Sequence, residues 1–192
     1  MLRRLSVAFL FSVAVTPFAH ATGEILSIIT DADTDRLDRF DEARNKALDE
    51  ASQSSDERAK AALLTALDAE VLPFADFDLT GNWKRRTIKA GGMAELVVYG
   101  WFNCRVTDDG SGWRLEKLTG SQRTVGRFFT ESDTRMIYLG SFFVAGDTAS
   151  EYGAGPQSDQ AGYATRTGEA TLQIAFPFPH YESTFDILQL RR

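Results

Sequence analysis

The sequence predicts a mainly β (α+β) protein, in which an N-terminal helical hairpin precedes an eight-stranded antiparallel up-and-down β-barrel. Apolar residues recur three and four positions apart between residues 37 and 67, which is the period of a helix. From Asn82 onward the period becomes two, in short segments rich in Val, Ile, Phe, Tyr and Thr. Clusters of Gly, Asp and Ser separate eight such segments, which favours a meander that closes on itself.

A secretory signal is expected ahead of these elements. Arg3 and Arg4 form a charged start, residues 5–15 are an apolar run, and Ala19-His20-Ala21 is a small-x-small cleavage site. A membrane span needs about 20 apolar residues, roughly twice the length of this run. We therefore expect a periplasmic or secreted protein with no membrane span after cleavage.

The chain is predicted to divide into three parts: a signal peptide at residues 1–21, a helical segment at 22–78 that docks on the barrel, and the barrel at 79–192. The first helix has its apolar face at Leu37, Phe40, Ala43, Ala47, Leu48 and Ala51. Ser54 and Glu57 have the spacing of a capping box that starts the second helix. Pro73 is expected to end the hairpin.

The eight strands are predicted from alternation and from the turn signals between them. The one long connection, residues 146–159, is the expected mobile loop. The predicted strands are Asn82 to Lys89, Glu95 to Val106, Gly112 to Leu118, Arg123 to Thr130, Thr134 to Ala145, Gln160 to Thr167, Ala170 to Phe176, and Ser183 to Leu190.

Composition excludes several classes of function. Without residues 1–21 the chain has 19 basic and 27 acidic side chains, a net charge of −8, which argues against nucleic-acid binding. Cys104 is the only cysteine, so no internal disulfide is possible, and its apolar neighbours predict a buried thiol. His180 would be the only histidine after cleavage, which excludes a metal site built from several histidines. Asp147, Glu151 and Asp159 lack the close, regular spacing of a calcium loop. We expect no metal and no cofactor.

The start of the first strand, Leu79-Thr80-Gly81-Asn82-Trp83, resembles the Gly-x-Trp start of lipocalins, avidins and small barrel-shaped protease inhibitors. The resemblance implies a lipocalin/avidin-like barrel in which Trp83 plugs one end. It also implies that an arginine near the last strand, Arg191 or Arg192, stacks on this tryptophan. It implies no particular ligand.

A second resemblance rests on seven motifs: Asp35-Arg36-Leu37, Arg86-x-Ile88-Lys89, Phe102-x-Cys104-Arg105, Lys117 to Arg123, Arg135 to Gly140, Tyr152-Gly153, and Glu182-Ser183 with Asp186. Together they resemble the exported bacterial family filed as domain of unknown function 4893. In that family's pattern a cysteine commonly occupies the position of Arg85 and could pair with the one at Cys104. The resemblance therefore implies that this cross-strand bridge is absent here.

The turn around Gly120 is the candidate binding site. Polar side chains on this turn could converge on an anion together with two arginines from adjacent strands. The predicted ligand-binding residues are Arg86, Arg105, Lys117, Thr119, Ser121, Gln122 and Arg123. Two alternatives stay open: the turn's side chains bond its own backbone, or Arg86 and Arg105 pair with acids such as Glu116 or Glu182. Lys84-Arg85-Arg86 is expected to be a solvated strand face or to receive the acidic helices.

Three classes of function follow. The first is a non-enzymatic, monomeric barrel that binds a small anionic or apolar ligand. The second is a protein-interaction or protease-inhibitor-like module with a solid barrel, filled by Phe128, Phe129, Phe142, Phe143, Phe176 and Phe185. The third is a hydrolase using His180, Ser183 and Asp186, although these residues lie on one segment whose side chains alternate in direction.

Overall fold

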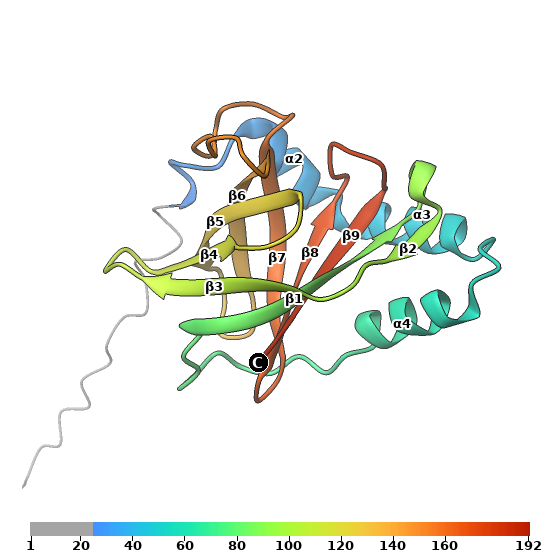
Figure 1. The fold of residues 1–192 in the computed structure, drawn as a ribbon, viewed down its shortest axis with the longest axis horizontal. Coiled ribbons are helices and arrows are strands. Elements are labelled where there is room, and N and C mark those ends of the chain that lie inside the picture. The colour runs from blue at the N-terminus through green and yellow to red at the C-terminus, as the bar shows by residue number, and fades with distance from the viewer. Residues whose placement is uncertain (1–24) are drawn as a thin grey trace, which may run out of the picture.

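The computed structural model describes residues 25–192, so the predicted signal peptide lies outside the described residues. Three helices precede a closed antiparallel barrel, which confirms the predicted architecture (Figure 1). The helices are α2 (Asp31–Asp38), α3 (Phe40–Ala51) and α4 (Glu57–Leu67). The strands are β1 (Gly81–Ala90), β2 (Leu96–Val98), β3 (Phe102–Asp108), β4 (Trp113–Lys117), β5 (Gln122–Thr130), β6 (Met136–Val144), β7 (Asp159–Gly168), β8 (Thr171–Pro177) and β9 (Phe185–Arg191).

The barrel closes by pairing of its first and last strands. β1 and β9 are antiparallel from Lys84 opposite Arg191 to Ala90 opposite Phe185. On its other edge β1 pairs first with β3 and then with the short β2. The predicted continuous strand from Glu95 to Val106 is therefore wrong, because residues 99–101 interrupt it. The amide of Tyr99 still donates to the carbonyl of Thr87 at 2.9 Å, so β2 and β3 follow the same edge.

The helix boundaries differ from the predicted ones for local reasons. Arg39 separates α2 from α3, where one helix was expected. Asp56, not Ser54, caps α4, because its carboxylate accepts hydrogen bonds from the amides of Arg58 and Ala59, both at 3.0 Å. The helix ends at Leu67, well before Pro73, so the proline does not terminate it.

Small side chains bring α3 and α4 close to the outer wall of the barrel. The apolar faces of both helices pack with the outward residues of β1 and β9 into one buried cluster. Its alanines, which have little bulk, allow close approach of the two layers. The cluster includes Ala43, Ala47, Ala51, Ala59, Leu63, Ala66, Ile88, Phe185 and Ile187. No helix in residues 25–192 is long and apolar enough to cross a membrane.

Trp83 closes one end of the barrel. Its indole Nε1 donates to the carbonyl of Leu79 at 2.8 Å, and the ring is 2% exposed. The guanidinium of Arg192 lies 4.4 Å from the ring centroid and donates to the carbonyls of Asp78 and Thr80. Arg192 is thus the stacking arginine that the Gly-x-Trp resemblance implied.

Tyr138 crosses the middle of the barrel interior. A Cβ atom on Gly126 or Gly140 would lie 2.5 Å from the tyrosine side chain, so both positions require glycine to make room for it. The Tyr138 ring meets Phe128 at 5.3 Å and Phe176 at 5.7 Å between centroids. These aromatic contacts separate the apolar half of the interior near Trp83 from a polar half at the other end.

Candidate ligand-binding site

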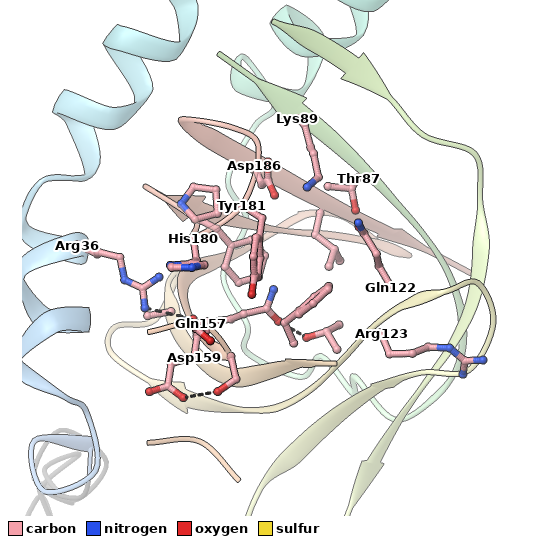
Figure 2. Close-up of a pocket in the computed structure, with 18 of the residues that line it drawn as sticks. Arg36, Thr87, Lys89, Gln122, Arg123, Gln157, Asp159, His180, Tyr181 and Asp186 are labelled. Carbon is pink, nitrogen blue, oxygen red and sulfur yellow. Dashed lines mark hydrogen bonds between the residues drawn. The ribbon is translucent and has the colours of Figure 1, made fainter. Parts of the chain in front are cut away.

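A cavity of about 70 Å³ lies in the polar half of the barrel, at the end opposite Trp83 (Figure 2). This volume corresponds to roughly five water-sized positions. Alternation along β1 places Arg85, Thr87 and Lys89 on the inner wall, in phase with Trp83. The barrel interior therefore forms the base of the cavity, and Arg36 of α2 and loop residues such as Gln157 and Tyr181 complete it.

Arg85 is the least satisfied charged group of this wall. It is 8% exposed, and within residues 25–192 its one hydrogen bond goes from Nη2 to the hydroxyl of Thr87 at 3.1 Å. Its Nε has no hydrogen-bond partner, and no carboxylate of residues 25–192 forms an ion pair with it. Burial lowers the pKa of Arg85 to about 10, so it stays protonated at neutral pH. The cavity thus contains a buried guanidinium that no carboxylate of residues 25–192 contacts, although Asp186 attracts it from a longer distance.

Lys89 and Asp186 face the cavity from β1 and β9, where they are direct partners in the ladder (Figure 2). The Nζ of Lys89 nevertheless pairs with Glu182 at 2.8 Å, at the rim. The Asp186 carboxylate accepts from the hydroxyl of Ser183 at 2.6 Å. Burial raises the pKa of Asp186 to about 6, although Lys89 opposes this shift. The charge of Lys89 is thus balanced by Glu182 at the rim, whereas no carboxylate of the described residues contacts Arg85.

A row of hydrogen bonds forms the polar floor of the cavity. The hydroxyls of Thr124 and Tyr138 lie 2.9 Å apart, and Thr124 also donates to the amide oxygen of Gln160 at 2.5 Å. The Gln160 oxygen is thereby occupied, which leaves its NH₂ group as a donor. Phe142, from β6, lines the wall above Thr124 and meets the ring of Tyr181 at 5.5 Å. The site combines donors at its base with aromatic side chains at its mouth.

Three of the predicted ligand-binding residues lie near this cavity. Gln122 and Arg123 line it, and Lys117, which does not line it, donates from Nζ to the carbonyl of Gln122 at 2.5 Å. Burial, reinforced by Arg85 and Arg123, lowers the pKa of Lys117 to about 7. The Arg123 guanidinium is turned away and donates to the carbonyls of Gly120 at 2.6 Å and Lys117 at 3.1 Å (Figure 2). Arg123 therefore bonds the turn's own backbone, which was one of the two alternatives.

The other four predicted residues are not brought to the cavity. Arg86 is on the outer face, where it donates to Gln189 at 2.8 Å and stacks on Trp101. Arg105 is exposed and donates to Asn82 at 3.1 Å. Both arginines bond side-chain amides rather than the predicted acids. On the Gly120 turn, the Thr119 hydroxyl accepts from the amide of Asn103 at 2.9 Å, and Ser121 is exposed.

Sequence reasoning missed Arg85, Thr87, Lys89 and Asp186. The expectation that Lys84, Arg85 and Arg86 form one solvated face is wrong, because neighbouring side chains of a strand point to opposite faces. The position of Trp83 could have identified the residues on β1. Trp83 was expected inside the barrel, so every second residue after it, Arg85, Thr87 and Lys89, should also point inward. The same parity on β9 places Asp186 on the face of Leu188 and Leu190.

The residues considered for a hydrolytic triad and for calcium binding make other contacts in the structure. Ser183 bonds Asp186, but His180 is exposed and contacts the ring of Tyr181 at 4.6 Å, so the three triad residue types do not form a relay. The Asp159 carboxylate accepts from the amides of Gly153 and Gly155, which folds the long loop onto β7. Within residues 25–192, no group of three metal-ligating side chains is gathered.

Comparisons with known proteins identify a family. No curated protein and no solved structure gives a significant match to this chain. The family model described as a domain of unknown function, DUF4893, matches residues 26–190. The resemblance predicted from the sequence motifs is confirmed, and the chain belongs to the DUF4893 family.

Proposed function

We propose that this chain is an exported, non-enzymatic binding protein that holds a small anionic ligand inside the open end of its barrel. The observation that carries the proposal is Arg85, a buried guanidinium in a cavity wall with an unpartnered Nε and no ion-pair contact among the described residues. Removing a charge from water without a partner is costly. An anionic ligand would offset that cost with charge-assisted hydrogen bonds.

The interior also supports a ligand over a solid interaction module. Of the six phenylalanines expected to fill the barrel, Phe128 and Phe176 belong to its inner core and Phe142 lines the cavity. Phe185 packs under the helices instead, and Phe129 packs against the cluster that contains α2 residue Leu37. The phenylalanines that point inward are too few to fill the open end of the barrel.

The binding test compares two neighbouring arginines that point to opposite faces. Titration calorimetry and thermal shift are run with acetate, butyrate, phosphate and sulfate on the wild type, Arg85→Met and Arg86→Met. At least one anion should raise the melting temperature of the wild type and of Arg86→Met, because a ligand that binds the native state stabilises it. Arg85→Met should lose the effect. If all four anions leave the wild type unchanged, or if Arg85→Met binds as well as the wild type, the proposal is wrong.

Export has its own test. The intact mass of protein recovered from the periplasm or medium should correspond to a chain that begins at Thr22. Recovery of full-length protein only from the cytoplasm would contradict export without touching the binding proposal.

A further inference from the structure

We propose that the ligand is an amphipathic monocarboxylate, held with its carboxylate on Arg85 and its hydrocarbon part against Phe142 and Tyr181 at the mouth. The inference rests on the proposed anion-binding function and specifies its ligand. It follows from the number of free charges, the order of groups along the cavity, and the size of the enclosed space.

The charge count favours a single negative group. Arg85 lines the cavity without an ion pair among the described residues, whereas Arg36 is paired with Asp33 and Lys89 with Glu182. The ammonium of Lys117 is also occupied, by the carbonyl of Gln122 and by the ring of Phe102 at 4.4 Å. Asp186 brings a carboxylate to the same wall and would repel a second anionic charge on the ligand. Phosphate and dicarboxylates therefore fit less well than a monoanion.

The order of groups along β1 sets the orientation of the ligand. Arg85 lies opposite Leu190, Thr87 opposite Leu188, and Lys89 opposite Asp186. Arg85 is thus two inward-facing positions further from the mouth of the cavity than Lys89, which pairs with Glu182 at the rim. A carboxylate on Arg85 must leave the rest of the ligand pointing toward the mouth.

Apolar side chains meet that outward part of the ligand. Phe176 and Leu188 line the cavity, and the Phe142–Tyr181 ring pair borders it at the mouth. Tyr181 is 44% exposed, so its ring still has apolar surface that a ligand can cover. A small inorganic oxyanion on Arg85 would leave this wall uncovered, whereas an alkyl chain would bury it.

The volume of the cavity limits how much of the ligand's hydrocarbon chain contributes to binding. About 70 Å³ accommodates roughly five non-hydrogen atoms at one per water-sized position. A carboxylate with two or three further carbons fills this space, and longer chains pass through the mouth. Each methylene that reaches the apolar wall should tighten binding about fourfold. Affinity should therefore rise from acetate to butyrate by about 15-fold and level off beyond hexanoate.

The experiment measures dissociation constants by calorimetry for acetate, butyrate, hexanoate, decanoate, succinate, phosphate and 1-butanol. Wild type is compared with Phe142→Ala and with Phe143→Ala, which changes the next residue on β6, outside this cavity. Phe142→Ala should flatten the chain-length series, and Phe143→Ala should preserve it. Circular dichroism checks folding, and Phe142→Leu, which keeps apolar bulk but removes the ring, replaces the alanine variant if that one is unfolded.

The outcomes separate this inference from the function it rests on. Tightest binding by phosphate or succinate, or a flat series from acetate to hexanoate in the wild type, would overturn the monocarboxylate while leaving anion binding intact. Equal affinity for 1-butanol and butyrate would overturn both, because the charge on Arg85 would then contribute nothing. Absence of binding by every compound would likewise overturn both.

Discussion

Replacing Arg85 by methionine should make the unliganded protein more stable. The substitution removes a buried guanidinium whose Nε has no partner and inserts an apolar side chain of similar reach. Exchange of a buried charged group for a hydrophobic one is neutral or stabilising by about 1–4 kcal/mol. Loss of the hydrogen bond to Thr87 subtracts about 1 kcal/mol. We expect a net gain of about 1–2 kcal/mol in the free energy of unfolding, or about 2–8 °C in melting temperature.

Urea unfolding followed by tryptophan fluorescence measures this change, in buffer free of carboxylates and phosphate. Arg86→Met is the matched control, because Arg86 bonds Gln189 and stacks on Trp101 at the outer face. The control should be neutral or slightly destabilised. A loss of 1 kcal/mol or more in Arg85→Met would refute the reasoning, since it would mean that the native structure already satisfies this guanidinium.

Three further predictions concern other parts of the barrel. The pKa of Asp186 is raised to about 6, so the native state binds more protons than the unfolded chain between about pH 4 and 6 and stability falls as pH rises through that window. Asp186→Asn should therefore have a free energy of unfolding about 3 kcal/mol above that of wild type at pH 7.5, and should lose this advantage near pH 4; an equal difference at both pH values would contradict the assignment. Gly140→Ala should cost about 1–3 kcal/mol in urea unfolding, since its Cβ would lie 2.5 Å from Tyr138, whereas Gly100→Ala, with no neighbour within 4 Å, should change little. The Cys104 thiol, whose pKa burial raises to about 12, should resist a thiol reagent in native buffer and react fully in denaturant, and rapid native labelling would show that it is accessible.

The strand pattern was predictable because the barrel interior imposes a period of two on every strand. Most of the predicted strands match the observed ones within two residues, as Ala170 to Phe176 matches β8. The interruption at residues 99–101 was not predictable, since Tyr99, Gly100 and Trp101 carry the aromatic and apolar character of a strand. What breaks the strand there is tertiary: Trp101 lies outside the barrel under the guanidiniums of Arg86 and Arg191.

The candidate site was only partly predictable because the type of a residue does not reveal which way its side chain points. The sequence singled out cationic and neutral polar residues, of which Lys117, Gln122 and Arg123 lie at the cavity or beside it. It favoured Arg86 over Arg85 as a ligand-binding residue. Which of these two side chains points into the barrel depends on the register of the strand. Burial of a charge is likewise a property of the closed barrel, which no local sequence pattern encodes.

Closure through β1 and β9 has a kinetic consequence for the growing chain. The seven paired positions are separated by about 100 residues, so this ladder has high contact order and forms late. At synthesis rates of about 5–20 residues per second, β1 waits roughly 5–20 s for its partner to be made. During that interval its edge is open to other chains and to chaperones. The polypeptide is therefore accessible to chaperones for several seconds before its barrel can close.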